Sequence, residues 1–181
     1  ITVKVRDAGL DGILGNGDDW SVSRTFTVIV NAVNDPPTLD AIGDPAAVNE
    51  DAGEQTVNLS GITAGGGETQ TLSVTAVSGN TSLIPDPTVI YTSPNATGSL
   101  KYTPVANQSG SAVITVTVHD AGLDGILGNG DDGTVSRTFT VIVNAVNDPP
   151  TLDAIADPAA VNEDAGEQTV ALSGITAGGG E

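Results

Sequence analysis

The sequence predicts an all-β protein, a seven-stranded Greek-key β-sandwich repeated in tandem with a period of 113 residues. This prediction rests on short segments of alternating apolar residues, on turn residues between them, and on an internal copy of the sequence. The 181 residues include no Cys and no Met, and only 3% are aromatic. The core must therefore consist mainly of Val, Ile, Leu and Ala, in strands punctuated by Gly and Pro.

The internal copy joins residues 1–68 to residues 114–181 at a constant offset of 113. The positions that differ are Lys4/Thr117, Arg6/His119, Trp20/Gly133, Ser21/Thr134, Gly43/Ala156 and Asn58/Ala171. A period of this length is too long for a solenoid repeat and suits a whole sandwich domain.

The domain boundaries are predicted from a duplicated linker. Residues 31–38, Asn-Ala-Val-Asn-Asp-Pro-Pro-Thr, recur as residues 144–151, and two consecutive prolines do not continue a central strand. Residues 1–35 are then the C-terminal hairpin of a preceding repeat, residues 36–148 a complete repeat, and residues 149–181 the N-terminal strands of a following repeat. Because partial sandwiches bury little apolar area, we expect a longer chain or a neighbouring molecule to complete the ends.

Alternation predicts the strands of residues 36–148. They are expected near 45–49 and at 54–60, 70–77, 89–91, 98–103, 112–119 and 134–145. In the segment 112–119, for example, Ile114, Val116 and Val118 share one face and Thr115 and Thr117 the other. Turn signals separate the segments about every 10–15 residues, which is typical of a Greek-key sandwich.

Strand direction brings acidic groups together at two poles. If successive strands run antiparallel, the first linker (residues 31–37) lies beside the loop 120–133 at one pole. The turn 49–53 then lies beside the second linker (residues 144–150) at the other pole. In a stack of repeats, these acidic segments meet at every junction, where unpaired carboxylates repel one another unless a cation intervenes.

The net charge of −18, with only five Lys and Arg residues, excludes the basic clusters with which proteins bind nucleic acid. The sequence has no apolar run of membrane-spanning length, so no membrane insertion is expected in this segment. The acidic residues gather in turns and linkers, which favours cation binding over a purely solubilising role.

The loop 120–133 carries oxygen ligands of the kind that Ca²⁺ prefers. Asp120, Asp124 and Asp131 occupy positions 1, 5 and 12 of a twelve-residue loop, with Gly125 at position 6. This spacing is similar to an EF-hand loop but departs from it at Gly122, in the Asp at position 12, and in lacking flanking helices. The alternative is a polar hairpin loop in which Asp and Asn stabilise turns.

Three motifs resemble the cadherin-like tandem repeats of large bacterial surface and adhesin proteins. They are Asn-Glu-Asp-Ala-Gly at 49–53, Val-x-Val-x-Asp-Ala-Gly at 116–122 and Val-Asn-Asp-Pro-Pro at 146–150. The resemblance covers essentially the whole chain and extends to the linkers of animal cadherins. It implies an immunoglobulin/cadherin-like β-sandwich, an extracellular or cell-surface location, and Ca²⁺ at the domain junctions.

The resemblance also implies a set of metal ligands. Within the complete repeat they are Glu50, Asp51, Asp120, Asn147 and Asp148, and their counterparts in the neighbouring repeats are Asn34, Asp35, Asp7, Glu163 and Asp164. The inserted residues Asp124, Asn129, Asp131 and Asp132 form a second site or none.

We therefore expect a structural or adhesive repeat array, a stalk or fibre whose junctions are rigidified by calcium and whose partners are neighbouring repeats of the same chain. One alternative is a self-assembling filament or S-layer-like subunit, in which identical chains make lateral contacts. A second is a carbohydrate-binding module, which would need a row of exposed aromatic residues that the sequence lacks.

An enzyme is not expected. The single histidine, His119, is replaced by Arg6 in the other copy, so a Ser–His–Asp arrangement has no support. Paired carboxylates suggest glycoside hydrolysis, but no aromatic residues are available to line a sugar-binding cleft.

Overall fold

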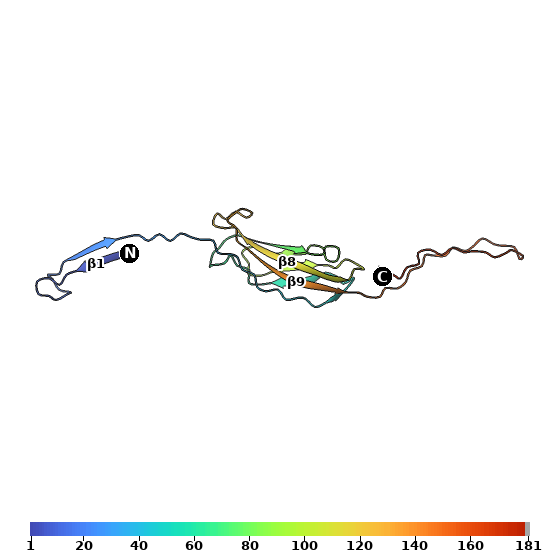
Figure 1. Ribbon diagram of the computed structural model, residues 1–181, viewed down its shortest axis with the longest axis horizontal. Coiled ribbons are helices and arrows are strands. Elements are labelled where there is room, and N and C mark those ends of the chain that lie inside the picture. The colour runs from blue at the N-terminus through green and yellow to red at the C-terminus, as the bar shows by residue number, and fades with distance from the viewer. Residues whose placement is uncertain (180–181) are drawn as a thin grey trace. The chain divides into compact units, whose positions relative to one another are not determined.

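The computed structural model describes residues 1–179, which contain strands, turns and no helix. The all-β prediction is therefore confirmed for this part of the chain. Nothing within it has the helical length and hydropathy that crossing a bilayer requires. The chain divides into two units, Ile1–Val33 and Asn34–Glu181 (Figure 1).

The first unit is a hairpin. Strand β1 (Thr2–Arg6) pairs antiparallel with β2 (Ser21–Thr25), with Arg6 opposite Ser21, and residues 7–20 form the connecting loop. Every strand residue is exposed. This exposure has a simple cause, because the unit contains no second sheet against which its apolar face can pack.

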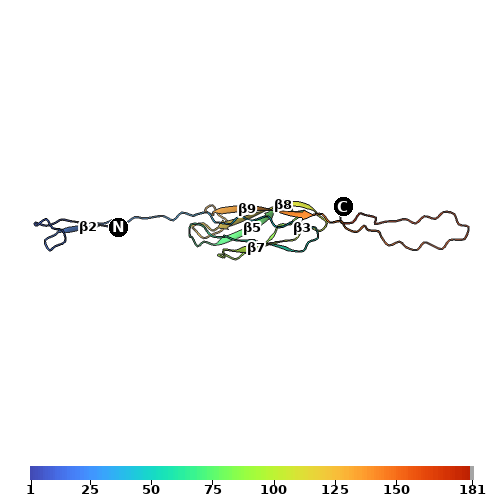
Figure 2. The same cartoon turned by 90° about the horizontal axis from the view of Figure 1, so that it is seen from below.

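The second unit contains the sandwich, whose strands are β3 (Val48–Asn49), β4 (Gln55–Leu59), β5 (Leu72–Ser78), β6 (Thr88–Ile90), β7 (Gly98–Tyr102), β8 (Gly110–Asp120) and β9 (Thr134–Asn144). One sheet has the order β3-β9-β8-β5 and the other β4-β7-β6. Figure 2 shows β9 on one side of the sandwich and β7, from the other sheet, on the opposite side. All pairs are antiparallel except β3–β9, which is parallel. The strand positions agree closely with the alternating segments of the sequence.

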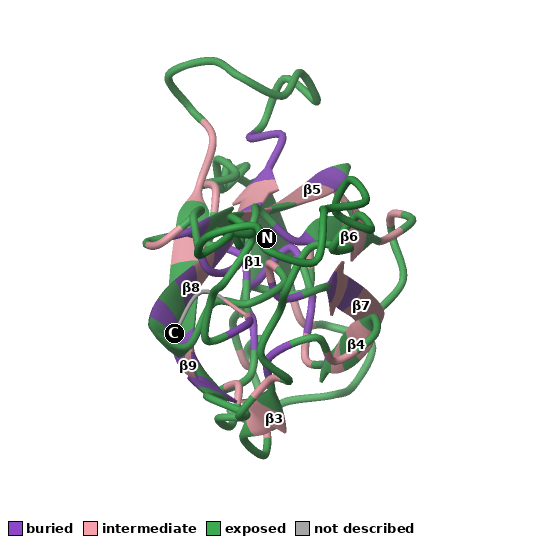
Figure 3. Ribbon diagram, turned by 90° about the vertical axis from the view of Figure 1, so that its right-hand side faces the viewer, coloured by how far each residue is buried: buried purple, intermediate pink, exposed green. Residues whose placement is uncertain are grey.

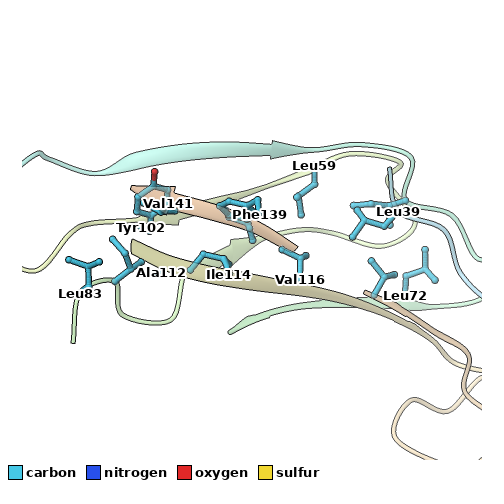
Figure 4. Close-up of a cluster of buried hydrophobic side chains, with 14 of the residues drawn as sticks. Leu39, Leu59, Leu72, Leu83, Tyr102, Ala112, Ile114, Val116, Phe139 and Val141 are labelled. Atoms are coloured by element: carbon cyan, nitrogen blue, oxygen red, sulfur yellow. The ribbon is translucent and has the colours of Figure 1, made fainter. Parts of the chain in front are cut away.

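The core lies between the two sheets. Along β8 the inward residues Ile114, Val116 and Val118 are fully buried, and the positions between them are half-buried. Figure 3 colours the ribbon by burial. From the other sheet, Leu59 and Leu100 belong to the same cluster, part of which is drawn in Figure 4. Burying aliphatic side chains of this size contributes roughly 1.5–3 kcal/mol each, so the cluster is the main source of the sandwich's stability.

Residues 149–179 reproduce local hydrogen bonds of residues 38–63 but not the strands of the sandwich. An isolated antiparallel bridge joins Thr151 to Thr176, as Thr38 is joined to Thr63 in the sandwich. Neither β3 nor β4 has a ladder counterpart among residues 149–179, because the strands with which they pair, β9 and β7, have no copies there. Residues 180–181, which the predicted following repeat includes, lie outside the described residues.

Candidate functional site

The loop 120–133 is folded by its own carboxylates. Asp120 ends β8, and its Oδ1 accepts hydrogen bonds from the backbone N–H groups of Gly122 (3.0 Å) and Gly133 (2.8 Å). Gly122 has a φ of 55°, a left-handed conformation that glycine adopts at little cost. These bonds close the loop at its base, so the carboxylate of Asp120 is held inward, toward the sandwich.

The outer half of this loop uses its acidic side chains for local turns. Asp124 accepts hydrogen bonds from the backbone N–H of Ile126 (2.8 Å) and the amide of Asn129 (2.7 Å). Asp131 Oδ2 accepts from Leu123 N (3.0 Å). Asp132 Oδ2 likewise accepts from the N–H of residue 128 at 2.6 Å. The structure thus engages the predicted ligands Asp124, Asn129, Asp131 and Asp132 in bonds within the loop, while Asp132 Oδ1 is buried without a partner.

The first linker is fastened to the base of the loop by Asn34. Its Nδ2 donates to Asp120 Oδ1 (3.1 Å) and to the main-chain oxygen of Asp131 (3.2 Å). Its Oδ1 accepts from Gln70 Nε2 at 2.6 Å. The adjacent Asp35 N–H donates to Glu68 Oε2 (3.3 Å). We call Asn34, Asp35, Glu68, Gln70 and the base of the loop, formed by Asp120 and Gly133, the linker pole.

Asp120 stands out in the linker pole because it is fully buried. Its Oδ1 accepts three hydrogen bonds, but its Oδ2 has no partner in the structure. The amide oxygen of Gln70 is also buried without a partner. Within residues 1–179 the sole ion pair joins Lys101 to Glu54, so no basic side chain compensates Asp120.

A buried carboxylate oxygen without a partner is costly, because desolvation is not offset by a hydrogen bond or an opposite charge. A hard cation removes that cost by accepting the oxygen as a ligand. The chemistry of Asp120 Oδ2 and Gln70 Oε1 fits Ca²⁺. In the described chain no three His, Asp or Glu residues are grouped as a ready metal cluster, so a cation at the linker pole would also need amide, main-chain or water oxygens.

At the opposite pole, the turn 49–53 contacts the start of the second linker. Glu50 is buried, and its Oε1 accepts a hydrogen bond from Val146 N at 2.7 Å. The Oδ1 of Asp51 accepts from Asn107 N at 3.1 Å, which directs this carboxyl toward a neighbouring loop. The carboxylate of the linker residue Asp148 lies against Gly179, as that of Asp35 lies against Gly66, and its Oδ2 is buried without a partner among the described residues.

Apart from a bond between the neighbours Asn147 and Asp148, the remaining predicted ligands have no hydrogen bond to either of these two groups within the described residues. Asn147 is exposed and donates only to Asp148 O. Glu163 and Asp164 are exposed in the turn of residues 162–165. In the first unit, the backbone N–H groups of Trp20 and Gly9 donate to the carboxylate of Asp7 and lower its pKa.

Glu68 and Gln70 are the functional candidates that sequence reasoning missed. The preceding glycines 65–67 indicate only a flexible turn, yet all three have positive φ values. A Cβ on Gly66 would lie 2.0 Å from Asp35 Oδ2. The glycines are therefore required for the linker to approach closely, and this approach places Glu68 and Gln70 beside Asn34.

No family model matches the chain, and no curated protein matches it. Among solved structures, domains 4 and 5 of the S-layer protein SbsC are similar at 18% identity and a TM-score of 0.37, covering 68% of this chain and 58% of that chain. The titin domains z1z2 in complex with telethonin are similar at 15% identity and a TM-score of 0.35, covering 68% and 55%. The chain therefore spans less than two thirds of the length of either.

Proposed function

We propose that the chain is part of an extracellular, non-enzymatic repeat array with a structural or adhesive role, in which calcium stiffens the domain junctions. Each repeat of 113 residues is a seven-stranded Greek-key sandwich of the immunoglobulin/cadherin-like class. The strand orders β3-β9-β8-β5 and β4-β7-β6, with parallel β3–β9 pairing, support this class, because the chain crosses between sheets as in such sandwiches.

The observation that carries the calcium proposal is the environment of Asp120. A fully buried carboxylate has one oxygen saturated by three N–H donors and the other unpartnered, directly beside a linker residue, Asn34. The turn needs only Oδ1 of Asp120 as an acceptor. A cation bound to Oδ2 would offset the cost of burying that oxygen without a partner.

The residues that would hold the ion at the linker pole are Asp120 and Gln70, with Asn34 and Asp35 fixing the linker. At the other pole, Glu50 would contribute from the sandwich. Asp148 of the second linker lies against Gly179 as Asp35 lies against Gly66, and would contribute to the junction with the segment that follows. When bound, Ca²⁺ supplies positive charge that neutralises converging carboxylates. The linker would then hold one angle, and the array would resist bending.

Thermal melting of the chain in calcium and in chelator tests this proposal. A ligand that binds only the folded state stabilises it by about 2.7 kcal/mol at a concentration 100 times its Kd, which raises the Tm of a domain of this size by roughly 10 °C. We expect Asp120→Asn to lose most of this rise. Asp157→Asn, which removes one exposed acid, is the matched control and should keep it.

An unchanged Tm in calcium for the unsubstituted chain would contradict calcium binding. An equal rise in Asp120→Asn and the unsubstituted chain would reject Asp120 as the ligand.

The alternative of a filament built by lateral strand pairing has less support from the structure. Strand β5 is an edge strand, and such edges can pair with other chains. Both ends of β5 are closed by side chains, because Leu72 N donates to Ser93 Oγ (3.0 Å) and Ser78 N to Asp86 Oδ1 (2.7 Å). We expect the chain to sediment without association through this edge, and removal of the caps by Ser93→Ala with Asp86→Ala to promote it.

A further inference from the structure

The two copies of the loop differ at one position that contacts the linker. Gly133, which precedes β9, corresponds to Trp20 in the first unit. The backbone framework is the same in both: Asp120 N donates to Gly133 O at 3.1 Å and Asp7 N to Trp20 O at 3.0 Å. In return, the N–H of Gly133 donates to Asp120 Oδ1 at 2.8 Å, and the N–H of Trp20 donates to Asp7 Oδ1 at 2.9 Å.

Gly133 is required by space and not by backbone conformation, since its φ is not in the left-handed range. A Cβ at this position would lie 2.4 Å from Asp120 Oδ2, 3.0 Å from Pro37 Cδ and 3.2 Å from Asn34 Nδ2. Pro37 is buried, so it has little room to move. A side chain at position 133 and a seated first linker therefore compete for one volume.

In the first unit the position that corresponds to Gly133 carries a side chain, that of Trp20. The indole of Trp20 is attached to the same framework and is 80% exposed. It adjoins open surface lined by Asp7, Leu10 and Asp18. A linker of the Asn34–Pro37 kind cannot approach Asp7 as it approaches Asp120 unless this indole leaves.

We propose that the residue at position 20 or 133 determines the kind of junction that a repeat forms at its linker pole. Glycine at this position leaves room for a linker to cover the aspartate, as Asn34 and Pro37 cover Asp120 beside Gly133. Trp20 excludes such a linker, so the repeat that contains residues 1–33 has an open, more compliant junction. A second consequence rests on the proposed function: this junction also lacks the buried calcium site. Stiff and flexible junctions would then coexist in one array.

Transplanting the tryptophan into the complete sandwich tests this inference. Gly133→Trp is compared with Gly130→Trp, which places the same side chain in the same loop where a Cβ meets nothing within 4 Å. Linker seating is read from hydrogen exchange of the Asp35 N–H and the Asn34 side-chain amide, both hydrogen-bonded in the linker pole. We expect exchange at least about tenfold faster in Gly133→Trp, because local opening controls exchange, and no change in Gly130→Trp.

Calcium-dependent melting of the same variants gives the second measurement. We expect Gly133→Trp to lose the rise in Tm and Gly130→Trp to retain it. If the unsubstituted chain shows no rise, the calcium proposal fails, while hydrogen exchange still decides whether the linker is excluded.

Linker exchange in Gly133→Trp as slow as in the unsubstituted chain would overturn the inference. If far-ultraviolet circular dichroism shows that Gly133→Trp does not fold, Gly133→Ala replaces it. Its single Cβ already meets the three atoms named above, so it must also accelerate linker exchange relative to Gly130→Ala. Equal rates in these two alanine variants would refute the proposal.

Discussion

The internal copy allows one core prediction to be tested against a built-in control. Phe139 on β9 is 2% exposed within the core cluster, whereas its counterpart Phe26 in the first unit is 52% exposed. Replacing a buried phenylalanine by alanine costs about 3–5 kcal/mol, because transfer energy is lost and a cavity remains. Replacing an exposed one changes stability by less than about 0.5 kcal/mol.

The assay is urea unfolding of Phe139→Ala and Phe26→Ala, followed by far-ultraviolet circular dichroism. For a slope of about 2 kcal/mol per M, the midpoint of Phe139→Ala should fall by about 2 M. Against a typical total stability of 5–15 kcal/mol, roughly a fifth or more is lost. The midpoint of Phe26→Ala should stay unchanged. Equal midpoints for the two variants would refute the assignment of the core to residues 36–148.

Three further predictions concern single side chains. In chelator, Asp120→Ala should destabilise the sandwich by about 3–5 kcal/mol because three N–H donors lose their acceptor; Asp120→Asn keeps an oxygen and should stay within about 1 kcal/mol of the unsubstituted chain in urea unfolding. Glu50→Ala should cost about 1–3 kcal/mol by leaving the Val146 N–H without its acceptor, and Glu50→Gln should restore most of this stability. Burial raises the pKa of both Tyr91 and Tyr102, so their contribution to stability is complete below the unfolded tyrosine pKa and is lost as pH rises through the folded values. Ultraviolet absorbance and circular dichroism should therefore show ionisation and unfolding together. Ionisation at the ordinary tyrosine pKa without unfolding would contradict this.

Much of the fold follows from local sequence patterns. The alternation of Ile114, Val116 and Val118 with Thr115 and Thr117 is enough to predict which face of β8 is buried, because side chains in a strand alternate between faces. Antiparallel succession of the strands also leads to the expectation that the first linker lies beside the loop 120–133, and the structure places Asn34 against Asp120.

The use of individual carboxylates could not be predicted in the same way. Asp51 contacts the N–H of Asn107, 56 residues away, and no local pattern specifies that pairing. Asp124 and Asp131 satisfy backbone donors of their own loop, which a ligand count from spacing alone cannot distinguish from metal binding. The hydrogen bond from the Asp35 N–H to Glu68 depends on positive φ values at glycines 65–67. From the sequence alone, this run of glycines predicts only a flexible turn.

The central claim is that the buried oxygen of Asp120 binds calcium, and equilibrium titration of Ca²⁺ against a chromophoric chelator tests it most directly. The competitor reports binding without relying on stability or shape. The account predicts saturable binding by the chain and at least about tenfold weaker binding at the linker pole in Asp120→Asn, a loss of about 1.4 kcal/mol. No competition by the unsubstituted chain, or equal competition by Asp120→Asn, would contradict it.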